Sequence, residues 1–455
     1  MFMVGIYDDE YEIYCDYFDK EKEMADFSEL LDPFTQSMYD YVRPVYIHIT
    51  DYELLCNLAH IIRNELLEEV ISHSTKICLS LKQVFQRMLQ DIQERLIYII
   101  QTYIRDEISL HNPTQNDINY PDVLISAQTI VTPPPTPPLT SSTDNTTSTL
   151  TSSPPLILLP PNKSKGLYPT LEKTLTCLSK LYLVVDTKIF EGLAQEAVLS
   201  CMQSLIQASS LIANNKSNPL SLVDSQLFLI KYFITLREQI TPFDINFVIE
   251  KIVDFPQLKH ALQSLYNYGS LFKFSTNNPI YNILSSATNP RVTSTSIDAK
   301  KDLEKELKGV IETFIISTSN KIIDPLVALL TKISVFTNQQ QQAAATQPTA
   351  LLSSQPFATV ERIKEVVEQV HSRIETDLPQ VVERMKIYLT PSTLALLSKP
   401  IRTNIIDSFD QINQYSKKYY TDDQIKAMSL MPMETLRVLL DKHVPTQIII
   451  NQPNK

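Results

Sequence analysis

Glycine is nearly absent from this chain, and its scarcity limits the folds that are open to the sequence. Only five of the 455 residues are glycine, about 1% against a usual share of about 7%. Glycine supplies the positive φ angles of tight turns and lets a backbone approach a phosphate closely. The scarcity therefore excludes glycine-rich phosphate loops, dinucleotide-binding turns and folds made of many strands and turns.

Apolar residues recur at helical spacing throughout the chain. Steps of three and four residues place them on one face of an α-helix, and alternating strand patterns are scarce. Single rows are Ile77, Leu81, Val84, Met88, Ile92, Ile99 and Tyr103; Leu171, Leu175, Leu178, Tyr182, Val185 and Ile189; Ala194, Val198, Cys201, Leu205, Ala208 and Ile212; and Val360, Ile363, Val367, Val370 and Ile374. The pattern predicts an all-α fold built as rods or bundles of antiparallel helices.

The segment from Leu222 to Ile240 carries two adjacent rows, which predict a helix with a wide buried face. The rows are Val223, Leu227, Ile230 and Ile234, and Leu229, Phe233, Leu236 and Ile240. Helix starts are predicted at Thr390-Pro391 and Asp324-Pro325, where a capping residue precedes a first-turn proline. The second site is equally compatible with a kink inside a longer helix.

Two segments of low complexity divide the chain. Residues 132–161 carry nine prolines around a Ser/Thr tract with one charged residue, Asp144, and 338–356 include Gln339–Gln342 and Ala343–Ala345. Such segments have too little apolar surface to offset their ordering entropy. We expect an acidic end and first helical block at 1–125, a disordered linker at 126–165, a central bundle at 166–335, a connector at 336–356 and a last helical block at 357–455.

Limited proteolysis checks this division. If 132–161 is disordered, a protease at low concentration should cut there first and leave two folded pieces. A linker that resists cleavage while other segments are cut would contradict the prediction.

Negative charge is concentrated at one end of the chain. Residues 1–32 hold eleven acidic and two basic residues, so this segment carries −9 of the net charge of −11. A nearly neutral body with an acidic end releases few phosphate counterions, which makes nucleic acid an unsuitable partner. Direct docking on anionic lipid, which requires clustered Lys and Arg, is disfavoured for the same reason.

Cysteine usage and hydropathy indicate an intracellular protein. The five cysteines, Cys15, Cys56, Cys78, Cys177 and Cys201, are odd in number, far apart and without a C-x-x-C pair, which favours reduced thiols over disulfides or a zinc site. The first 25 residues lack the apolar run of a secretory signal. No stretch is expected to reach the 18 apolar residues of a membrane span.

Two patterns resemble metal sites, and each has a simpler interpretation. Asp8-Asp9-Glu10-Tyr11-Glu12 has the acidic spacing of all-α prenyl-transfer enzymes, but it lies among many other acids, which favours a solvated acidic run. Glu368 and His371 have the i, i+3 spacing of iron ligands in four-helix carboxylate proteins. No other histidine has a glutamate three residues before it, so we predict no metal, no cofactor and no metal-binding residues.

No catalytic constellation stands out, and we predict that the chain is not an enzyme. His73 and Cys78 are five residues apart and do not share a helical face, so they do not form a nucleophile and base pair. Tyr7, Tyr11, Tyr14, Tyr17 and Phe18 interleave with the acids of the first segment. That segment either packs as a helix, serves as a docking segment for a basic partner or is a frayed acidic terminus. The apolar rows fit intramolecular bundles or an intermolecular coiled coil.

Eight stretches resemble, in order, the third-subunit family of the conserved oligomeric Golgi complex. The first ends in Arg43-Pro44-Val45-Tyr46-Ile47-His48, and the second reads Arg87-Met-Leu-Gln-Asp-Ile-Gln-Glu-Arg-Leu96. The whole set is Leu31–His48, Arg87–Leu96, Tyr120–Asp122, Tyr168–Tyr182, Phe190–Ala197, Asp224–Lys231, Leu236–Phe243 and Lys399–Asn404.

The resemblance implies a non-catalytic subunit of a vesicle-tethering complex, in the form of an elongated rod of stacked antiparallel helical bundles. It implies a peripheral place on the cytoplasmic face of Golgi membranes, with a cytosolic pool, and a role in retrograde transport within the Golgi. Implied partners are the other subunits, fusion proteins and small GTPases; no small-molecule substrate is implied, and membrane contact is indirect. The family's chains extend further at the N-terminus with coiled-coil helices, and we expect that half to be absent from this sequence, which is then a fragment, a shortened gene model or a divergent short form.

Two other interpretations stay open at this stage. A generic helical scaffold or a subunit of another vesicle tether, such as an exocyst-like one, would be found at the plasma membrane or endosomes in place of the Golgi. An all-α enzyme would contain metal in the purified chain, and the metal would be lost when Asp8, Asp9 or His371 is changed to alanine.

Overall fold

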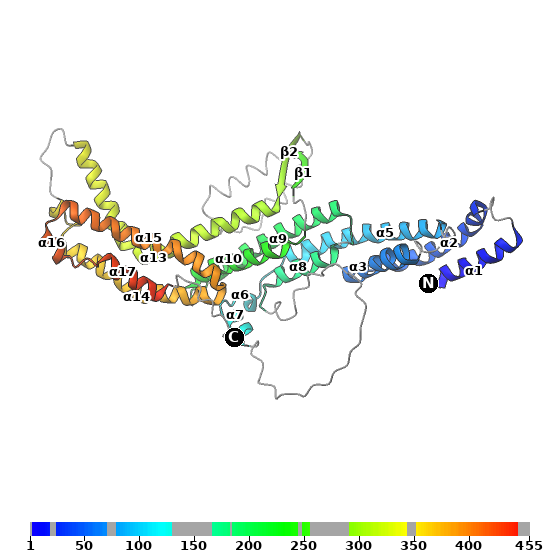
Figure 1. The fold of residues 1–455 in the computed structure, drawn as a ribbon, viewed down its shortest axis with the longest axis horizontal. Helices are drawn as coiled ribbons and strands as arrows, with labels where there is room; N and C mark the ends of the chain where they lie inside the picture. The colour runs from blue at the N-terminus through cyan, green and yellow to red at the C-terminus, as the bar shows by residue number, and fades with distance from the viewer. Residues whose placement is uncertain are drawn as a thin grey trace, which may run out of the picture. The chain divides into compact units, whose positions relative to one another are not determined.

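The computed structural model describes residues 2–18, 24–70, 79–129, 166–182, 184–243, 248–254, 291–343 and 352–444. Within these ranges nearly all regular structure is helical (Figure 1). The all-α prediction is confirmed. The expected linker lies largely outside the described residues, as do Ile77 of the predicted helical row and the pair His73 and Cys78.

Contacts between Cα atoms divide the chain into two compact units, and each is assembled from segments that are distant in sequence. Unit 1 comprises Met1–Asn112, Ser142–Ser204 and Glu238–Lys301; unit 2 comprises Pro113–Ser141, Leu205–Arg237 and Asp302–Lys455. The three helical blocks expected from the sequence stay a prediction, because residues 130–165 and 344–351, where their connectors fall, are outside the described ranges.

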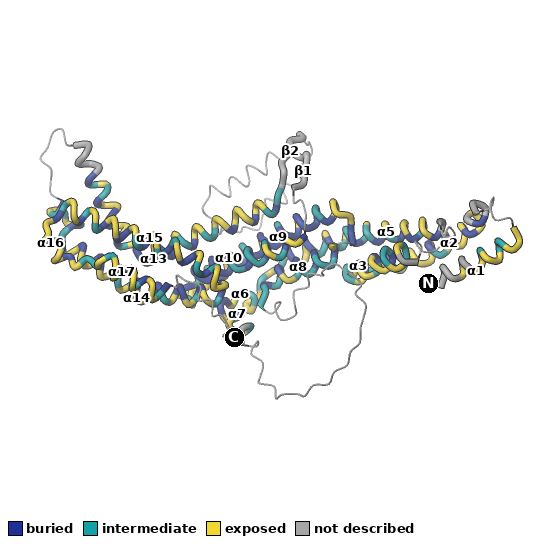
Figure 2. The backbone as a smooth tube through the Cα atoms, in the orientation of Figure 1, coloured by how far each residue is buried: buried dark blue, intermediate teal, exposed yellow. Residues whose placement is uncertain are grey.

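Unit 1 is built mainly from helices of the first two hundred residues. Its elements are α1 (Phe2–Tyr17), α2 (Met24–Ile47), α3 (Tyr52–His60), the π-helix η1 (Ile61–Val70), α5 (Leu79–Tyr103), the π-helix η2 (Ile104–Ser109), α8 (Pro169–Leu181) and the first part of α9 (Thr187–Ala213). Helix α5 packs along α2 and α3. Figure 2 shows buried positions recurring along these helices.

The buried face of α5 differs in part from the predicted one. Its most buried side chains are Leu81, Phe85, Met88, Ile92, Leu96, Ile100, and in η2 Ile104 and Ile108. Val84, Ile99 and Tyr103, which the sequence placed on the same face, are only half-buried. The repeated four-residue steps exceed the 3.6-residue period, so the buried face drifts around the helix before the wider π-helical turns of η2 begin.

The predicted row from Leu171 to Ile189 is wrong as a single helical face. Helix α8 ends at Leu181, and α9 begins only at Thr187, so the row is interrupted by a turn. The β-branched Val184 and Val185 are poor helix formers, and Asp186 directly precedes the new helix, where capping side chains are favoured. Val185 is nevertheless buried in the turn, whereas Ile189 is exposed.

The rows predicted for α9 and α10 (Ser221–Ile240) are confirmed. All six members of the α9 row, from Ala194 to Ile212, are buried. On α10 both adjacent rows are buried except for Ile234, which is half-buried. A helix covered on so wide a face is a core element, as the doubled row predicts.

Unit 2 contains most of α10 and the helices of the last third of the chain. Its other elements are α6 (Gln115–Ile118), α7 (Asp122–Thr129), α13 (Ala299–Ala343), the 3₁₀ turn η3 (Leu352–Ser354), α14 (Val360–Tyr388), α15 (Pro391–Tyr419), α16 (Asp422–Ala427) and α17 (Met433–His443). On α14, Ile363, Val367, Val370 and Ile374 are buried as predicted, and Val360 is half-buried.

One of the two predicted helix starts is confirmed, and the other is wrong. Thr390 caps α15 by accepting a hydrogen bond from the backbone N–H of Thr393, and Pro391 occupies the first turn. Pro325 instead lies inside the continuous helix α13, which was the alternative interpretation of Asp324-Pro325. Helix α13 also continues to Ala343, through the first part of the segment expected to be a connector.

One small sheet departs from the helical pattern. Strands β1 (Val248–Asp254) and β2 (Arg291–Asp298) pair antiparallel, with Val248 opposite Asp298 and an irregularity between Ile252 and Asp254. The sequence did not predict this pair, because its two strands are short and about forty residues apart in sequence.

Candidate interaction surfaces

A single carboxylate joins two of the stretches that resemble the Golgi family. Asp91 of α5 accepts hydrogen bonds at its Oδ2 atom from the hydroxyl of Tyr39 (2.5 Å), Nε of Arg43 (3.1 Å) and the hydroxyl of Tyr46 (3.0 Å), all on α2. The guanidinium of Arg87 lies 4.3 Å from the centre of the Tyr39 ring. We call these residues the Asp91 cluster, and its geometry gives the two stretches a structural role in pairing α2 with α5.

The Asp91 cluster is held in its charged form. Burial alone would raise the pKa of Asp91, but the hydrogen bonds from Tyr39, Arg43 and Tyr46 outweigh it and hold this pKa below its usual value. The hydrogen bond to Asp91, with a smaller effect of Tyr39, raises the pKa of Arg43. Hydrogen bonds between charged groups are stronger than neutral ones, so the cluster contributes to the stability of unit 1.

A second buried cluster lies in unit 2 around Asp224 of α10. The Asp224 side chain is fully buried, and its Oδ2 atom accepts a hydrogen bond from the side-chain amide of Asn218 (2.6 Å). Nε of Arg384, on α14, is 3.9 Å from Oδ1. Nζ of Lys231 donates to the backbone carbonyl of Tyr388 (3.2 Å). Asp224 and Lys231 therefore tie α10 to α14.

Aromatic side chains connect this second cluster to another of the resembling stretches. The hydroxyls of Tyr120 and Tyr232 are 2.7 Å apart, and the Tyr120 ring meets Phe228 edge-on at 4.9 Å between ring centres. The same ring is stacked near Tyr388, at 6.3 Å. Tyr120–Asp122 and Asp224–Lys231, which are a hundred residues apart, thus belong to one core.

Asp224 and Asp91 have opposite effects on the pH dependence of stability. Burial raises the pKa of Asp224, although Asn218 and Arg384 act in the other direction. An acid whose folded pKa is raised costs stability as pH rises through the range between its unfolded and folded values. Asp224→Asn should therefore leave the free energy of unfolding at pH 7.5 unchanged or higher, and make it depend less on pH above about 4.

Urea denaturation at pH 4.5 and pH 7.5 measures this difference, with Asp410→Asn, an exposed position on α15, as the matched control. A large loss of stability in Asp224→Asn at pH 7.5 would show that pairing with Arg384 outweighs the cost of burial, and would contradict the prediction.

The acidic first segment is a helix with two distinct sides. On one side Tyr11 and Tyr14 of α1 pack on Phe27 of α2, with ring centres 5.4 and 5.0 Å apart. Away from this contact the carboxylates of Asp9, Glu12 and Asp16 are exposed, and Glu10, closer to Tyr14, is exposed too. The interpretation as a helix is confirmed, and the acidic side is available to a basic partner.

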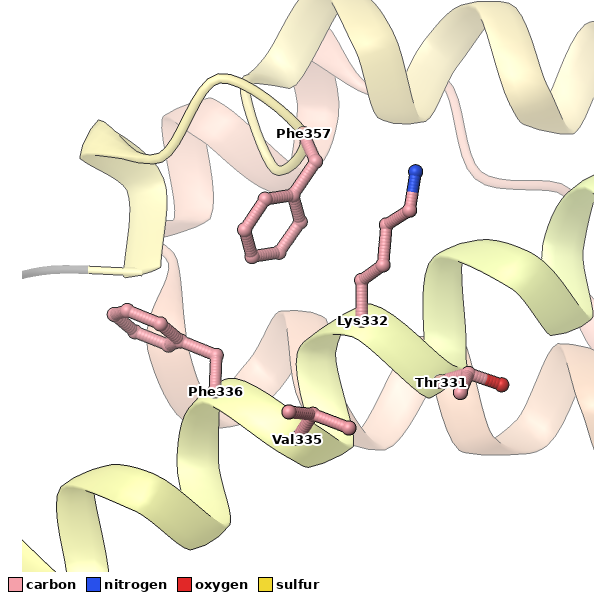
Figure 3. Close-up of a pocket in the computed structure, with 5 residues that line it drawn as sticks. All are labelled: Thr331, Lys332, Val335, Phe336 and Phe357. Atoms are coloured by element: carbon pink, nitrogen blue, oxygen red, sulfur yellow. The ribbon is translucent and has the colours of Figure 1, made fainter.

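An open groove runs along the last part of α13 in unit 2. Thr331, Lys332, Val335 and Phe336 of α13 line it together with Phe357, and its volume is about 300 Å³ (Figure 3). The Phe336 and Phe357 rings meet edge-on at 6.1 Å. The volume is at the lower end of the range for small-molecule sites, and the lining is mostly apolar.

Glu368 and His371, which were considered as metal ligands, lie on the surface of α14. Glu368 of α14 is exposed and 3.9 Å from Nζ of Lys364, and Nδ1 of the half-exposed His371 is 3.8 Å from Glu375. The described ranges contain no group of three or more His, Cys, Asp or Glu side chains arranged to hold a metal ion. The absence of a metal stays a prediction.

Three cysteine thiols are buried in unit 1. Burial raises the pKa of Cys56, Cys177 and Cys201 to about 12, so at neutral pH they are thiols and poor nucleophiles. The four cysteines within the described ranges are free, as the odd and scattered pattern predicts.

Helix α13 is more apolar than the sequence analysis expected. Its stretch Ala299–Thr337 contains an 18-residue window with a mean hydropathy of at least 1.2 and no more than two charged residues, which is long and apolar enough to cross a membrane. A buried core helix has the same composition, and 44% of that window is buried within the protein. The expectation that no stretch approaches a membrane span is therefore corrected.

Comparison with known proteins accounts for the ordered stretches. Residues 1–258 match the family model described as "Conserved oligomeric Golgi complex subunit 3, C-terminal", and residues 306–443 match the "COG3 C-terminal cap domain". No solved structure matches the chain.

Curated relatives match over nearly the whole chain. Conserved oligomeric Golgi complex subunit 3 of Dictyostelium discoideum is 55% identical over 425 residues, which cover 91% of this chain and 43% of the relative. The Homo sapiens protein is 32% identical over 463 residues, 96% of this chain and 55% of the relative. The chain thus spans about half the length of these relatives, and by both family models and relatives it belongs to the family of conserved oligomeric Golgi complex subunit 3.

Proposed function

We propose that the chain is a non-catalytic subunit of a Golgi vesicle-tethering complex and acts in retrograde transport within the Golgi through protein–protein interactions. The observation that carries the proposal is the match of both family models, in order, to residues 1–258 and 306–443. The relatives' names give the Golgi and the multisubunit complex. The transport step and its direction are our inference.

Long packed helices suit this task physically. A helix extends about 1.5 Å per residue, and α13 alone has 45 residues. Several weak contacts on one support combine through effective concentration into strong attachment. The partners we propose are the other subunits, fusion proteins and small GTPases, with the chain on the cytoplasmic face of Golgi membranes and in a cytosolic pool.

The chemistry of the described residues supports a role without catalysis. Within the Asp91 cluster, polar side chains bind one another across the interface of α2 and α5. Within the cluster around Asp224, polar side chains likewise bind one another, and Arg384 of α14 pairs with Asp224 of α10. The buried thiols are protonated at neutral pH. These groups therefore serve packing between helices.

The test is to express the tagged chain in its own cells after depletion of the endogenous protein. We expect the chain at the Golgi, co-purification of the other complex subunits, and return of resident Golgi enzymes from dispersed vesicles to cisternae. A chain with Glu368→Ala, a change at an exposed position of α14, should behave as the unchanged chain.

Two results would overturn the proposal. One is a folded chain, verified by circular dichroism, that stays diffuse and co-purifies with no tether subunit. The other is a chain found at the plasma membrane or endosomes, which would favour an exocyst-like tether.

A further inference from the structure

Helix α2 has a second apolar face in addition to the one that packs on α5. Leu30, Phe34, Tyr41 and Val45 have exposed fractions of 59%, 65%, 83% and 66%. Their spacing of four, seven and four residues places them on one side of the helix. We call these four residues the α2 row, and they form an uncovered apolar surface among the described residues of unit 1.

The α2 row is distinct from the core face of the helix. The buried side chains of Leu31, Thr35, Tyr39 and Tyr46 follow a neighbouring line of α2, and Tyr39 and Tyr46 bind Asp91 of α5. Contiguous exposed apolar patches of this kind mark interaction sites. Aromatic side chains such as Phe34 and Tyr41 are typical anchors of such interfaces.

The structure shows which kind of element this face accepts. Phe27 lies seven residues before Phe34, and Tyr41 seven after it, so the three rings follow one another along the helix. Phe27 is buried because the helix α1 packs on it through Tyr11 and Tyr14. The next two rings, Phe34 and Tyr41, are exposed. The α2 row thus continues an existing helix–helix contact.

The geometry of the α2 row also matches a helix. From Leu30 to Val45 the row extends about 22 Å, or four turns. Leu30 and Tyr41 are eleven residues apart, as are Phe34 and Val45. An eleven-residue repeat follows an almost straight line on an α-helix, so a partner helix lying alongside can contact all four side chains.

Beside the α2 row the same eleven-residue repeat places hydrogen-bond acceptors. The sequences Glu29-Leu30-Leu31-Asp32-Pro33-Phe34 and Asp40-Tyr41-Val42-Arg43-Pro44-Val45 share an acid before the first apolar residue and a proline before the last. Pro33 and Pro44 lie inside α2 and have no N–H to donate to the carbonyls of Glu29 and Asp40. Each repeat therefore offers an exposed carboxylate and a backbone carbonyl without its helical donor.

The charge around the α2 row selects the partner. Helix α1 has no Lys or Arg, and the single basic residue of α2, Arg43, is bound to Asp91. Carboxylates and carbonyls that lack their usual helical donor are complemented by Lys and Arg side chains. A second copy of this acidic surface and an anionic membrane would both be repelled.

We propose that the α2 row binds an amphipathic α-helix of another protein, whose apolar side is flanked by Lys and Arg and which lies along α2 where the contact with α1 ends. The inference rests on α1 and α2 alone and goes beyond the proposed function, because it holds for any complex that the chain joins.

Two labelled synthetic helical peptides of 22 residues test the proposal by fluorescence anisotropy with the full chain. Both carry leucines at alternating three- and four-residue steps; one has Lys and Arg beside them, and the other has Glu. We expect the basic peptide to bind, more weakly at high salt, and the acidic peptide not to bind. Phe34→Ser combined with Tyr41→Ser should weaken binding at least about tenfold, equivalent to about 1.4 kcal/mol.

A matched control removes apolar surface elsewhere. Leu222→Ser combined with Leu396→Ser changes two exposed residues of α10 and α15 and should leave binding of the basic peptide unchanged. Circular dichroism verifies that both double variants are folded, as expected for exposed positions.

Four results would overturn the proposal: no binding of the basic peptide, equal binding of both peptides, unchanged binding by the Phe34→Ser, Tyr41→Ser variant, or equal weakening by the control variant. A dimer in sedimentation that this variant abolishes would make a second copy the occupant. Binding to vesicles containing phosphatidylserine that is lost in this variant would make a membrane the occupant.

Discussion

Changing Leu178 to aspartate is expected to lower the free energy of unfolding by about 4 kcal/mol. Leu178 lies on α8 and is 1% exposed, among the buried side chains of Leu171, Leu175 and Leu181. An aspartate at this position would place an unpaired charge in the core of unit 1. Urea denaturation followed by circular dichroism measures the change.

Leu222→Asp is the matched control for this substitution. Leu222 is 56% exposed and lies in the first turn of α10, where an acidic side chain is favoured by the helix dipole. Its effect should stay within about 0.5 kcal/mol. Equal urea midpoints of unfolding for Leu178→Asp and the unchanged chain would show that this side of α8 faces water.

Changing Asp91 to alanine is expected to lower the free energy of unfolding by about 3 kcal/mol. The substitution leaves the buried hydroxyls of Tyr39 and Tyr46 and the guanidinium of Arg43 without their shared acceptor. The pKa of Asp91 is lowered in the folded state. Its contribution to the free energy of unfolding is therefore fully present above about pH 4 and is lost as pH falls through the folded pKa.

Glu94→Ala, on an exposed position of α5 where the carboxylate accepts a hydrogen bond from Gln90 one turn away, should change stability by less than about 0.5 kcal/mol. The difference in free energy of unfolding between Asp91→Ala and Glu94→Ala that is measured at neutral pH should become smaller in acid. A difference that stays constant from pH 7 to pH 3 would contradict the role given to the ionised Asp91.

The helical content could be predicted from the sequence, because it depends on residues close together along the chain. The rows of α9, α10 and α14 are confirmed since each is repeated over about three or more turns. The break between α8 and α9 was missed because Val185, buried in the turn, keeps the apolar spacing that a continuous helix would have. Pro325 in α13 shows the converse, a local stop signal that a long helix overrides.

The clusters could not be predicted, because their members are distant in sequence. Nothing near Asp91 indicates that three side chains of α2, some fifty residues earlier, bind it. The resemblance marked both stretches without showing that they meet. The α2 row was also missed, since the distinction between it and the core face one position away requires knowledge of which side packs on α5.

The three buried thiols of unit 1 allow local opening of its helices to be measured directly. Cys56, Cys177 and Cys201 are shielded from solvent and protonated, so an alkylating reagent can reach them only while the surrounding helices are apart. The rate at which these thiols are alkylated would therefore report how often the helices open. A partner that closes unit 1 on binding would slow that rate, without any label added to the chain.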